Sequence, residues 1–144
     1  MKPTSYEDEL KRTGALAFAV KGVSMRPLIK AGRDVAVVHA TQAPLDRFDV
    51  GFFKRDNGDY VLHRVLERTE DGYLFCGDSQ TFTEAVREDQ VLGRMEGLVR
   101  NGAAVKLDGP AYRTYVALWC GLLPARMFLL KVLHALGIWV PAKA

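Results

Sequence analysis

The chain has 144 residues, which suits one domain that buries about two thirds of its unfolded surface and needs no disulfide or metal for stability. Its hydrophobic fraction of 49% and charged fraction of 26% are typical of a globular protein, so the six prolines and 13 glycines mark turns and not disorder. The net charge of +3 is too small to indicate nucleic acid as a partner, and we expect none.

The cysteines and histidines exclude the commoner metal and redox sites. The two cysteines, Cys76 and Cys120, and the three scattered histidines lack metal-ligand or redox spacing, so we expect ordinary thiols in a reducing compartment, no metal and no cofactor. The first twelve residues are polar and lack the apolar core of a signal peptide. We therefore expect no amino-terminal signal or anchor, and a protein that is cytoplasmic or membrane-associated.

The first third of the chain predicts a short helix followed by strands. Ser5 is a potential N-cap, acidic residues precede basic ones in the next two turns, and Gly14 stops the helix. Apolar and β-branched runs then predict two strands, separated by a turn and one helical turn that begins near Pro27. The expected elements are a helix over Tyr6–Arg12, a strand over Ala15–Val20, a helical turn within Met25–Ala31 and a strand over Asp34–Val38.

The middle of the chain carries the clearest hairpin. Strands over Val50–Arg55 and Tyr60–Arg68 flank Asp56-Asn57-Gly58-Asp59, where Asn-Gly favours a type I′ turn. A third strand follows over Tyr73–Gly77, and a last pair, over Gln90–Arg100 and Ala103–Leu107, surrounds Asn101-Gly102. The chain is therefore predicted to be mainly β, with a coiled antiparallel sheet or a partly open barrel.

The composition changes at Asp108-Gly109-Pro110, which predicts a β domain over residues 1–108 and a helical segment over residues 109–144. The run Ala111–Val140 is apolar, and Gly121 and Pro124 should divide it into two amphipathic pieces that lack a confident membrane span. On one helix an apolar arc faces a basic arc, with Trp119 and Trp139 as amphipathic anchors. The apolar arc is Phe128, Leu129, Val132, Ala135, Leu136 and Trp139; the basic arc is Arg126, Lys131 and His134. Packing on the sheet, a membrane interface and a protein partner all remain open for this segment.

Three residues supply the groups of a serine hydrolase. Ser24 lies in the turn Gly22-Val23-Ser24-Met25-Arg26-Pro27, His63 lies inside a strand, and Asp78 follows Gly77 at a strand end. A serine hydroxyl needs a base to accept its proton, an imidazole titrates in the useful range, and a carboxylate can orient it. Each residue alone is more often structural, so the interpretation depends on their combination.

This combination resembles type I signal peptidases and their relatives, the self-cleaving domains of SOS-type repressors. Ser24-Met25-Arg26-Pro27 with Gly32-Arg33-Asp34-Val35, then Asp49-Val50, Leu62-His63-Arg64-Val65 and Gly77-Asp78-Ser79, resemble that family's boxes in the family's order. The resemblance covers about Ala17 to Gly97. It implies a signal-peptidase type of fold, Ser24 as nucleophile and, because His63 stands where many members have lysine, the archaeal and endoplasmic-reticulum branch with histidine as base.

The resemblance also implies an activity and shows where this chain departs from the pattern. The expected activity is a serine endopeptidase that cleaves a peptide or preprotein through Ser24, His63 and Asp78. Gly22 replaces a serine that often assists the oxyanion, so the oxyanion and substrate would be bound by the backbone around Gly22, Ser24 and Met25. Ser79-Gln80 replaces the usual asparagine, and neither Glu84 nor Asp89 aligns cleanly with a second expected acid.

Two other functions remain open from the sequence. A non-catalytic descendant would bind a peptide or a membrane partner in the same groove without turnover. Autoproteolysis in the manner of the repressor domains is less favoured, because that class uses lysine as the base and no DNA-binding module precedes this segment.

Overall fold

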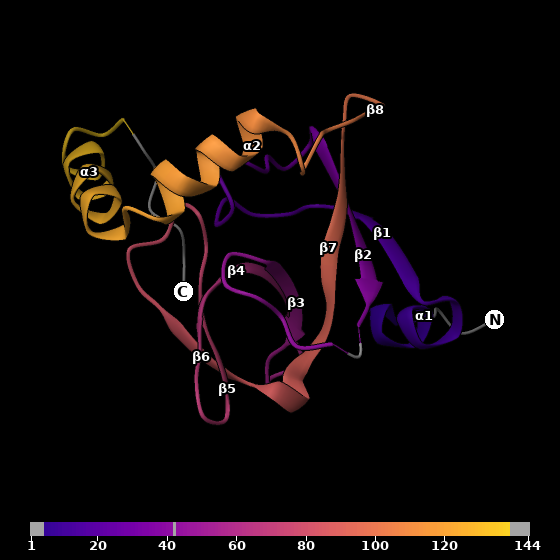
Figure 1. The fold of residues 1–144 in the computed structure, drawn as a ribbon. Coiled ribbons are helices and arrows are strands. Elements are labelled where there is room, and N and C mark those ends of the chain that lie inside the picture. Colours follow the sequence, from indigo (N-terminus) through magenta and orange to yellow (C-terminus); the bar gives the residue numbers. More distant parts are fainter. Residues whose placement is uncertain (1–4, 42, 139–144) are drawn as a thin grey trace.

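An antiparallel sheet of eight strands forms the body of the protein in the computed structural model, which describes residues 5–41 and 43–138 (Figure 1). The strand order is β1-β2-β7-β3-β4-β5-β6, with β8 paired to β7, so the sheet has two edges and does not close. The mainly β class with helices at both ends is therefore confirmed. The strands are β1 (Ala15–Ala19), β2 (Asp34–Ala40), β3 (Val50–Lys54), β4 (Tyr60–Arg68), β5 (Gly72–Cys76), β6 (Glu84–Arg87), β7 (Val91–Arg100) and β8 (Ala103–Ala104).

The predicted amino-terminal helix is confirmed as α1 (Tyr6–Thr13). The Ser5 side chain accepts a hydrogen bond from the Asp8 N–H, and Gly14 ends the helix in the left-handed conformation at φ 81°. Leu10 is the buried residue of this helix, and it joins the core formed by β1, β2 and β7. The helix thus covers one end of the sheet beside β1.

Two hairpin predictions need correction. At Asn57-Gly58 only the glycine takes a positive φ, so the β3–β4 turn is not type I′; the two positive φ values of that turn occur instead at Asn101 (52°) and Gly102 (80°). The strand expected over 103–107 is only the two-residue β8, while β6 was not predicted. β6 and β8 are short, and β6 lies at an edge of the sheet, so the strand pattern that their sequences carry is weak.

Asp34, at the start of β2, fixes the segment that follows the Ser24 turn. Its carboxylate accepts hydrogen bonds from the Lys30 N–H at 2.9 Å, from Arg33 Nε at 2.9 Å and from Arg100 Nε at 3.0 Å. Burial raises the pKa of Asp34, but these bonds outweigh it and hold the pKa well below its usual range. Both arginines also donate to the Leu28 carbonyl, so the turn is tied to β2 and β7.

The carboxyl-terminal segment folds as two helical pieces, as predicted. The first runs through α2 (Pro110–Tyr115) and a π-helical turn (Val116–Cys120), and the second is α3 (Leu123–Ala135). The two pieces meet at an angle of 78°. They lie together at the end of the molecule opposite α1 (Figure 1). Trp139, expected in the apolar arc, lies outside the described residues.

The apolar and basic arcs expected on α3 do not face the core and the solvent in the way that their polarity suggests. Arg126 of the expected basic arc is buried together with Leu130, whereas Phe128 and Leu136 of the apolar arc are 71% and 66% exposed. The inner face of α3 therefore carries a charged side chain, and much of the apolar arc faces solvent. Cys76 and Cys120 are both free and buried in the region that α3 and the π-helical turn cover.

Candidate active site

Ser24 lies in a turn that is anchored to the core on both sides. Gly22 adopts φ 83°, a left-handed conformation that strains any residue with a side chain, which gives a physical reason for glycine at this position. Met25 and Ile29, which follow Ser24 in the chain, are buried in the core beside β2 and β7. The Ser24 side chain is left partly exposed above this anchored backbone.

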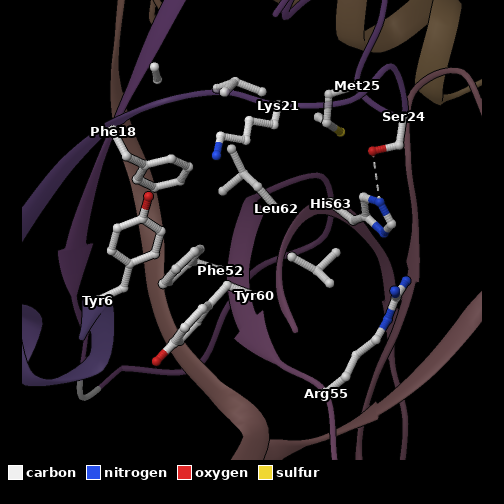
Figure 2. A pocket seen from close by; sticks show the side chains of 13 residues that line it. Tyr6, Phe18, Lys21, Ser24, Met25, Phe52, Arg55, Tyr60, Leu62 and His63 are labelled. Atoms are coloured by element: carbon white, nitrogen blue, oxygen red, sulfur yellow. Dashed lines mark hydrogen bonds between the residues drawn. The ribbon is translucent and has the colours of Figure 1, made fainter. Parts of the chain in front are cut away.

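The structure brings His63 to the serine hydroxyl, as the sequence predicts. His63 sits opposite Gly51 in the β3–β4 pair, and its Nε2 lies 3.0 Å from Ser24 Oγ (Figure 2). This distance is within the range required for direct proton transfer. When the ring proton is on Nδ1, Nε2 is free to accept the hydrogen bond that the hydroxyl donates. The two groups are separated by 39 positions in the chain, and tertiary packing brings them together.

The imidazole of His63 is held neutral by its surroundings. The side chain is almost fully buried, and burial lowers its pKa to about 4; Arg55 acts in the same direction, while Glu84 and Asp78 oppose the change. Nδ1 of His63 is buried without a hydrogen-bond partner among the described residues. The ring is therefore a neutral base at pH 7, with one nitrogen directed at Ser24.

Asp78 does not meet His63 in a hydrogen bond among the described residues; its carboxylate binds Arg64. Arg64 Nε donates to Asp78 Oδ1 and Arg64 Nη2 donates to Oδ2, both at 2.9 Å, and both side chains are inaccessible to solvent. The Tyr115 hydroxyl of α2 donates to Oδ2 at 2.6 Å, and Trp119 Nε1 donates to the Asp78 carbonyl at 2.7 Å. Asp78 thus joins β4 to the carboxyl-terminal helices.

The loop 77–80 is hydrogen-bonded to the turn that carries Ser24. The Ser79 N–H donates to the Ser24 carbonyl at 2.9 Å, and the Ser79 hydroxyl donates to the Val23 carbonyl at 2.6 Å. A side chain at Gly77 would place its Cβ 2.4 Å from the same Ser24 carbonyl oxygen, so only glycine fits there. Ser79 therefore ties the loop directly to the turn that carries Ser24.

Glu84 is the carboxylate with the stronger effect on His63. It raises the His63 pKa more than Asp78 does, and it is held by Arg55, whose Nε and Nη2 donate to its two oxygens at 2.8 and 2.9 Å. Both side chains of this ion pair are about one quarter exposed. Figure 2 shows the Arg55 side chain directed toward the His63 ring from the side away from Ser24. Sequence reasoning had placed Glu84 only as one of two available acids.

A groove of about 250 Å³ opens beside the serine–histidine pair. The pair lies at one end, and an aromatic cluster lies at the other, where Phe52 stacks on Tyr60 at 5.6 Å and Tyr6 stacks on Phe18 at 5.3 Å (Figure 2). Leu62, Met25 and Lys21 line the space between these ends. The groove is therefore lined mainly by apolar and aromatic side chains, with Lys21 between its ends and Ser24, His63 and Arg55 at one end.

One wall of the groove is the open edge of the sheet. The Ala40 N–H donates to the Gly14 carbonyl, and the Val20 N–H donates to the Asp34 carbonyl. Because hydrogen-bonded positions alternate along an antiparallel pair, the N–H and C=O groups of the even-numbered residues of β1 are the ones that face β2. The N–H and C=O groups of Ala17 and Ala19 therefore point away from β2. The corresponding groups of Ala15 are already bonded to the Thr13 hydroxyl.

The described residues contain no group of three histidine, cysteine or acidic side chains that could hold a metal ion. Comparison of the chain with models of known protein families gave no match, and neither did comparison with curated proteins.

Proposed function

We propose that the protein is a serine endopeptidase of the signal-peptidase type, with Ser24 as nucleophile and His63 as general base. The observation that carries the proposal is the 3.0 Å contact between Ser24 Oγ and His63 Nε2 at one end of a groove. Nδ1 of the same ring has no hydrogen-bond partner among the described residues, so the hydrogen bond of the imidazole is made to Ser24.

The chemistry follows from this pair. Ser24 Oγ attacks the scissile carbonyl carbon while its proton passes to His63 Nε2, which forms a tetrahedral oxyanion and an imidazolium. The C–N bond then breaks, and His63 returns the proton to the leaving amine. Water, deprotonated by the same imidazole, hydrolyses the ester to release the acid and restore Ser24. The backbone N–H groups of the turn from Gly22 to Met25 are the proposed donors to the oxyanion.

The substrate is an extended peptide or preprotein segment. A peptide strand laid along β1 would bond the outward N–H and C=O groups of Ala17 and Ala19, and alternate side chains would enter the apolar groove. Ala17 and Ala19 are exposed, and their small side chains leave the backbone accessible. The substrate carbonyl would then arrive at the end of the groove where Ser24 lies.

The two carboxylates near the site have different roles in this proposal. Glu84 stabilises the imidazolium through space, because its charge favours protonated His63 more than any other group does. Asp78 is a positioning residue, because its carboxylate is taken up by Arg64 and Tyr115 while the loop that carries it holds the Ser24 turn. Neither residue is the hydrogen-bonded third member expected from the sequence.

A direct test compares variants at the serines of the chain. The sequence holds three of them, Ser5, Ser24 and Ser79, and Ser5 is the matched control because it is exposed in the N-cap of α1. The intact protein is incubated with a peptide library, and new termini are identified by mass spectrometry. We expect wild type and Ser5→Ala to cleave the same peptides, and Ser24→Ala and His63→Ala to cleave none.

The alternative, a non-catalytic binder with the same groove, gives a different result. It predicts peptide retention on immobilised protein, no cleavage, and no covalent labelling of Ser24 by a serine-reactive probe. Cleavage that persists in Ser24→Ala would contradict the proposed nucleophile.

A further inference from the structure

The outer face of α3 is an apolar surface that the sheet does not cover. Phe128, Val132 and Leu136 recur every fourth residue and form one stripe, with Leu129 beside it, and all four are exposed. Leu118 and Leu122, which precede α3 in the chain, and Ile138, which follows it, are exposed as well. These seven account for all but two of the nine large apolar side chains that are exposed in the described part of the chain.

The inner face of α3 prevents the helix from turning this surface inward. Arg126 Nη2 donates to Cys76 Sγ at 3.2 Å and to the Gln80 carbonyl at 3.4 Å, and Leu130 is fully buried beside it. Rotating α3 would remove a buried guanidinium from its partners and expose Leu130. The apolar stripe is therefore a fixed outward surface of the folded protein.

Charge is distributed unevenly between this segment and the rest of the chain. All 17 acidic residues precede Gly109, where 16 basic residues nearly balance them. Residues 109–144 carry four basic residues and no acidic residue. Of these four, Lys131 is exposed on α3 and Arg113 is exposed on α2. The outward apolar stripe thus lies in a segment of uniformly positive charge.

We propose that this surface docks on an anionic lipid bilayer, with α3 lying in the plane of the interface. Apolar side chains that enter the acyl boundary while Lys and Arg meet acidic head groups are the two contributions that hold such helices. A second copy of the chain is less well matched, because a symmetric pairing would bring two positive segments together. An anionic bilayer is apolar inside and negative at its surface, so it matches both the stripe and the charge.

The geometry favours lying along the bilayer over crossing it. No single helix in the described ranges is long and apolar enough to span a membrane, and the two pieces reach that length only when they are counted together across their 78° bend. The 13 residues of α3 rise about 20 Å, against a hydrocarbon thickness of about 30 Å. The inner face, bound to the loop 77–80, would stay in contact with the protein.

The test is flotation of the full chain with vesicles. Phosphatidylcholine vesicles that contain phosphatidylglycerol are compared with vesicles of phosphatidylcholine alone, at low and high salt. We expect wild type to float with the anionic vesicles, to float poorly with the neutral ones, and to be released by salt. Phe128→Ser with Leu136→Ser should lower the vesicle partition coefficient at least about tenfold, because both side chains leave the acyl boundary.

A matched pair of charge reversals distinguishes attraction between the lipid and the α3 surface from attraction that depends only on the net charge of the protein. Lys131→Glu lies on the proposed surface, and Lys11→Glu changes the net charge equally on α1, at the opposite end of the molecule. We expect only Lys131→Glu to lose most of its vesicle binding, with circular dichroism showing that every variant is folded. The proposal is overturned if wild type does not float, if neutral vesicles bind it equally well, or if the variants bind like wild type. It is also overturned if the face instead forms a dimer that Phe128→Ser with Leu136→Ser dissociates.

Discussion

Replacing Asp78 with asparagine tests whether this carboxylate orients His63 or supports the fold. The side chain of Asp78 is fully buried and accepts two hydrogen bonds from Arg64 and one from Tyr115. Removing one partner of a buried ion pair typically costs 3–5 kcal/mol, because the other charge is left without compensation. Asparagine keeps one acceptor oxygen, so we expect a loss of about 3 kcal/mol, a large share of the roughly 5–15 kcal/mol of a typical domain.

The measurement is urea unfolding at pH 7, followed by far-ultraviolet circular dichroism and by tryptophan fluorescence. Trp119 is a suitable reporter because its Nε1 donates to the Asp78 carbonyl. Arg64→Met completes a double-mutant cycle with Asp78→Asn. We expect the double variant to be far less destabilised than the sum of the single variants, with a coupling free energy of about 2 kcal/mol or more.

The opposing interpretation makes a clear prediction of its own. If Asp78 acts mainly through His63, then Asp78→Asn should unfold at the wild-type urea concentration and lose peptidase activity. That result, or additive free energies in the cycle, would refute the structural role derived from the Arg64–Asp78 pair.

Four further predictions concern the serine–histidine pair and the residues around it. Because burial lowers the folded-state pKa of His63 to about 4, the acid limb of kcat/KM should fall near pH 4, and a limb near 6.5 would contradict the buried, neutral ring. In the unfolded chain the His63 pKa is near 6.5, so the unfolded state binds this proton first as the pH falls. The free energy of unfolding, measured by urea titration, should therefore decrease by about 3 kcal/mol between pH 6.5 and pH 4. His63→Gln should remove this pH dependence. Glu84→Gln should lower kcat and move the acid limb to still lower pH, because Glu84 raises the His63 pKa; an unchanged pH–rate profile would exclude the electrostatic role. Gly77→Ala should reduce kcat about a hundredfold or more, since its Cβ would lie 2.4 Å from the Ser24 carbonyl oxygen and displace the nucleophile. Gly109→Ala is the control, because the nearest atom to its Cβ is at an ordinary 3.6 Å.

Much of the fold and the central pair of the site could be predicted from the sequence, because local patterns determine them. Alternating side chains and turn residues located the β3–β4 hairpin, and the Ser5 and Gly14 caps located α1. Ser24 and His63 were predicted to meet, and they do. The pairing of β7 with both β2 and β3 joins distant segments, and no local pattern in the chain encodes that order.

The partner of Asp78 was predictable only in part, and the reason lies in strand geometry. His63 and Arg64 are neighbours in β4, so their side chains leave opposite faces of the strand. A carboxylate that meets Arg64 in a two-pronged pair cannot also bond the His63 ring on the other face. Strand alternation shows that Asp78 can bond either His63 or Arg64 but not both. The hydrogen bonds that Tyr115 and Trp119 donate to Asp78 hold it on the Arg64 face, and no local sequence pattern predicts these contacts.

The open edge of β1, where we propose that a peptide binds, also carries a risk of aggregation. Any exposed row of unpaired N–H and C=O groups can accept a strand from another copy of the protein and start aggregation. Here the row is short: β1 has five residues, the groups of Ala15 are occupied by Thr13, and the free positions are alanines. Alanine has weak β propensity and adds little apolar surface, so a partner strand gains few side-chain contacts. A ligand is held there only if its own side chains fill the neighbouring groove, which makes the edge selective for a fitting peptide and a poor template for self-assembly.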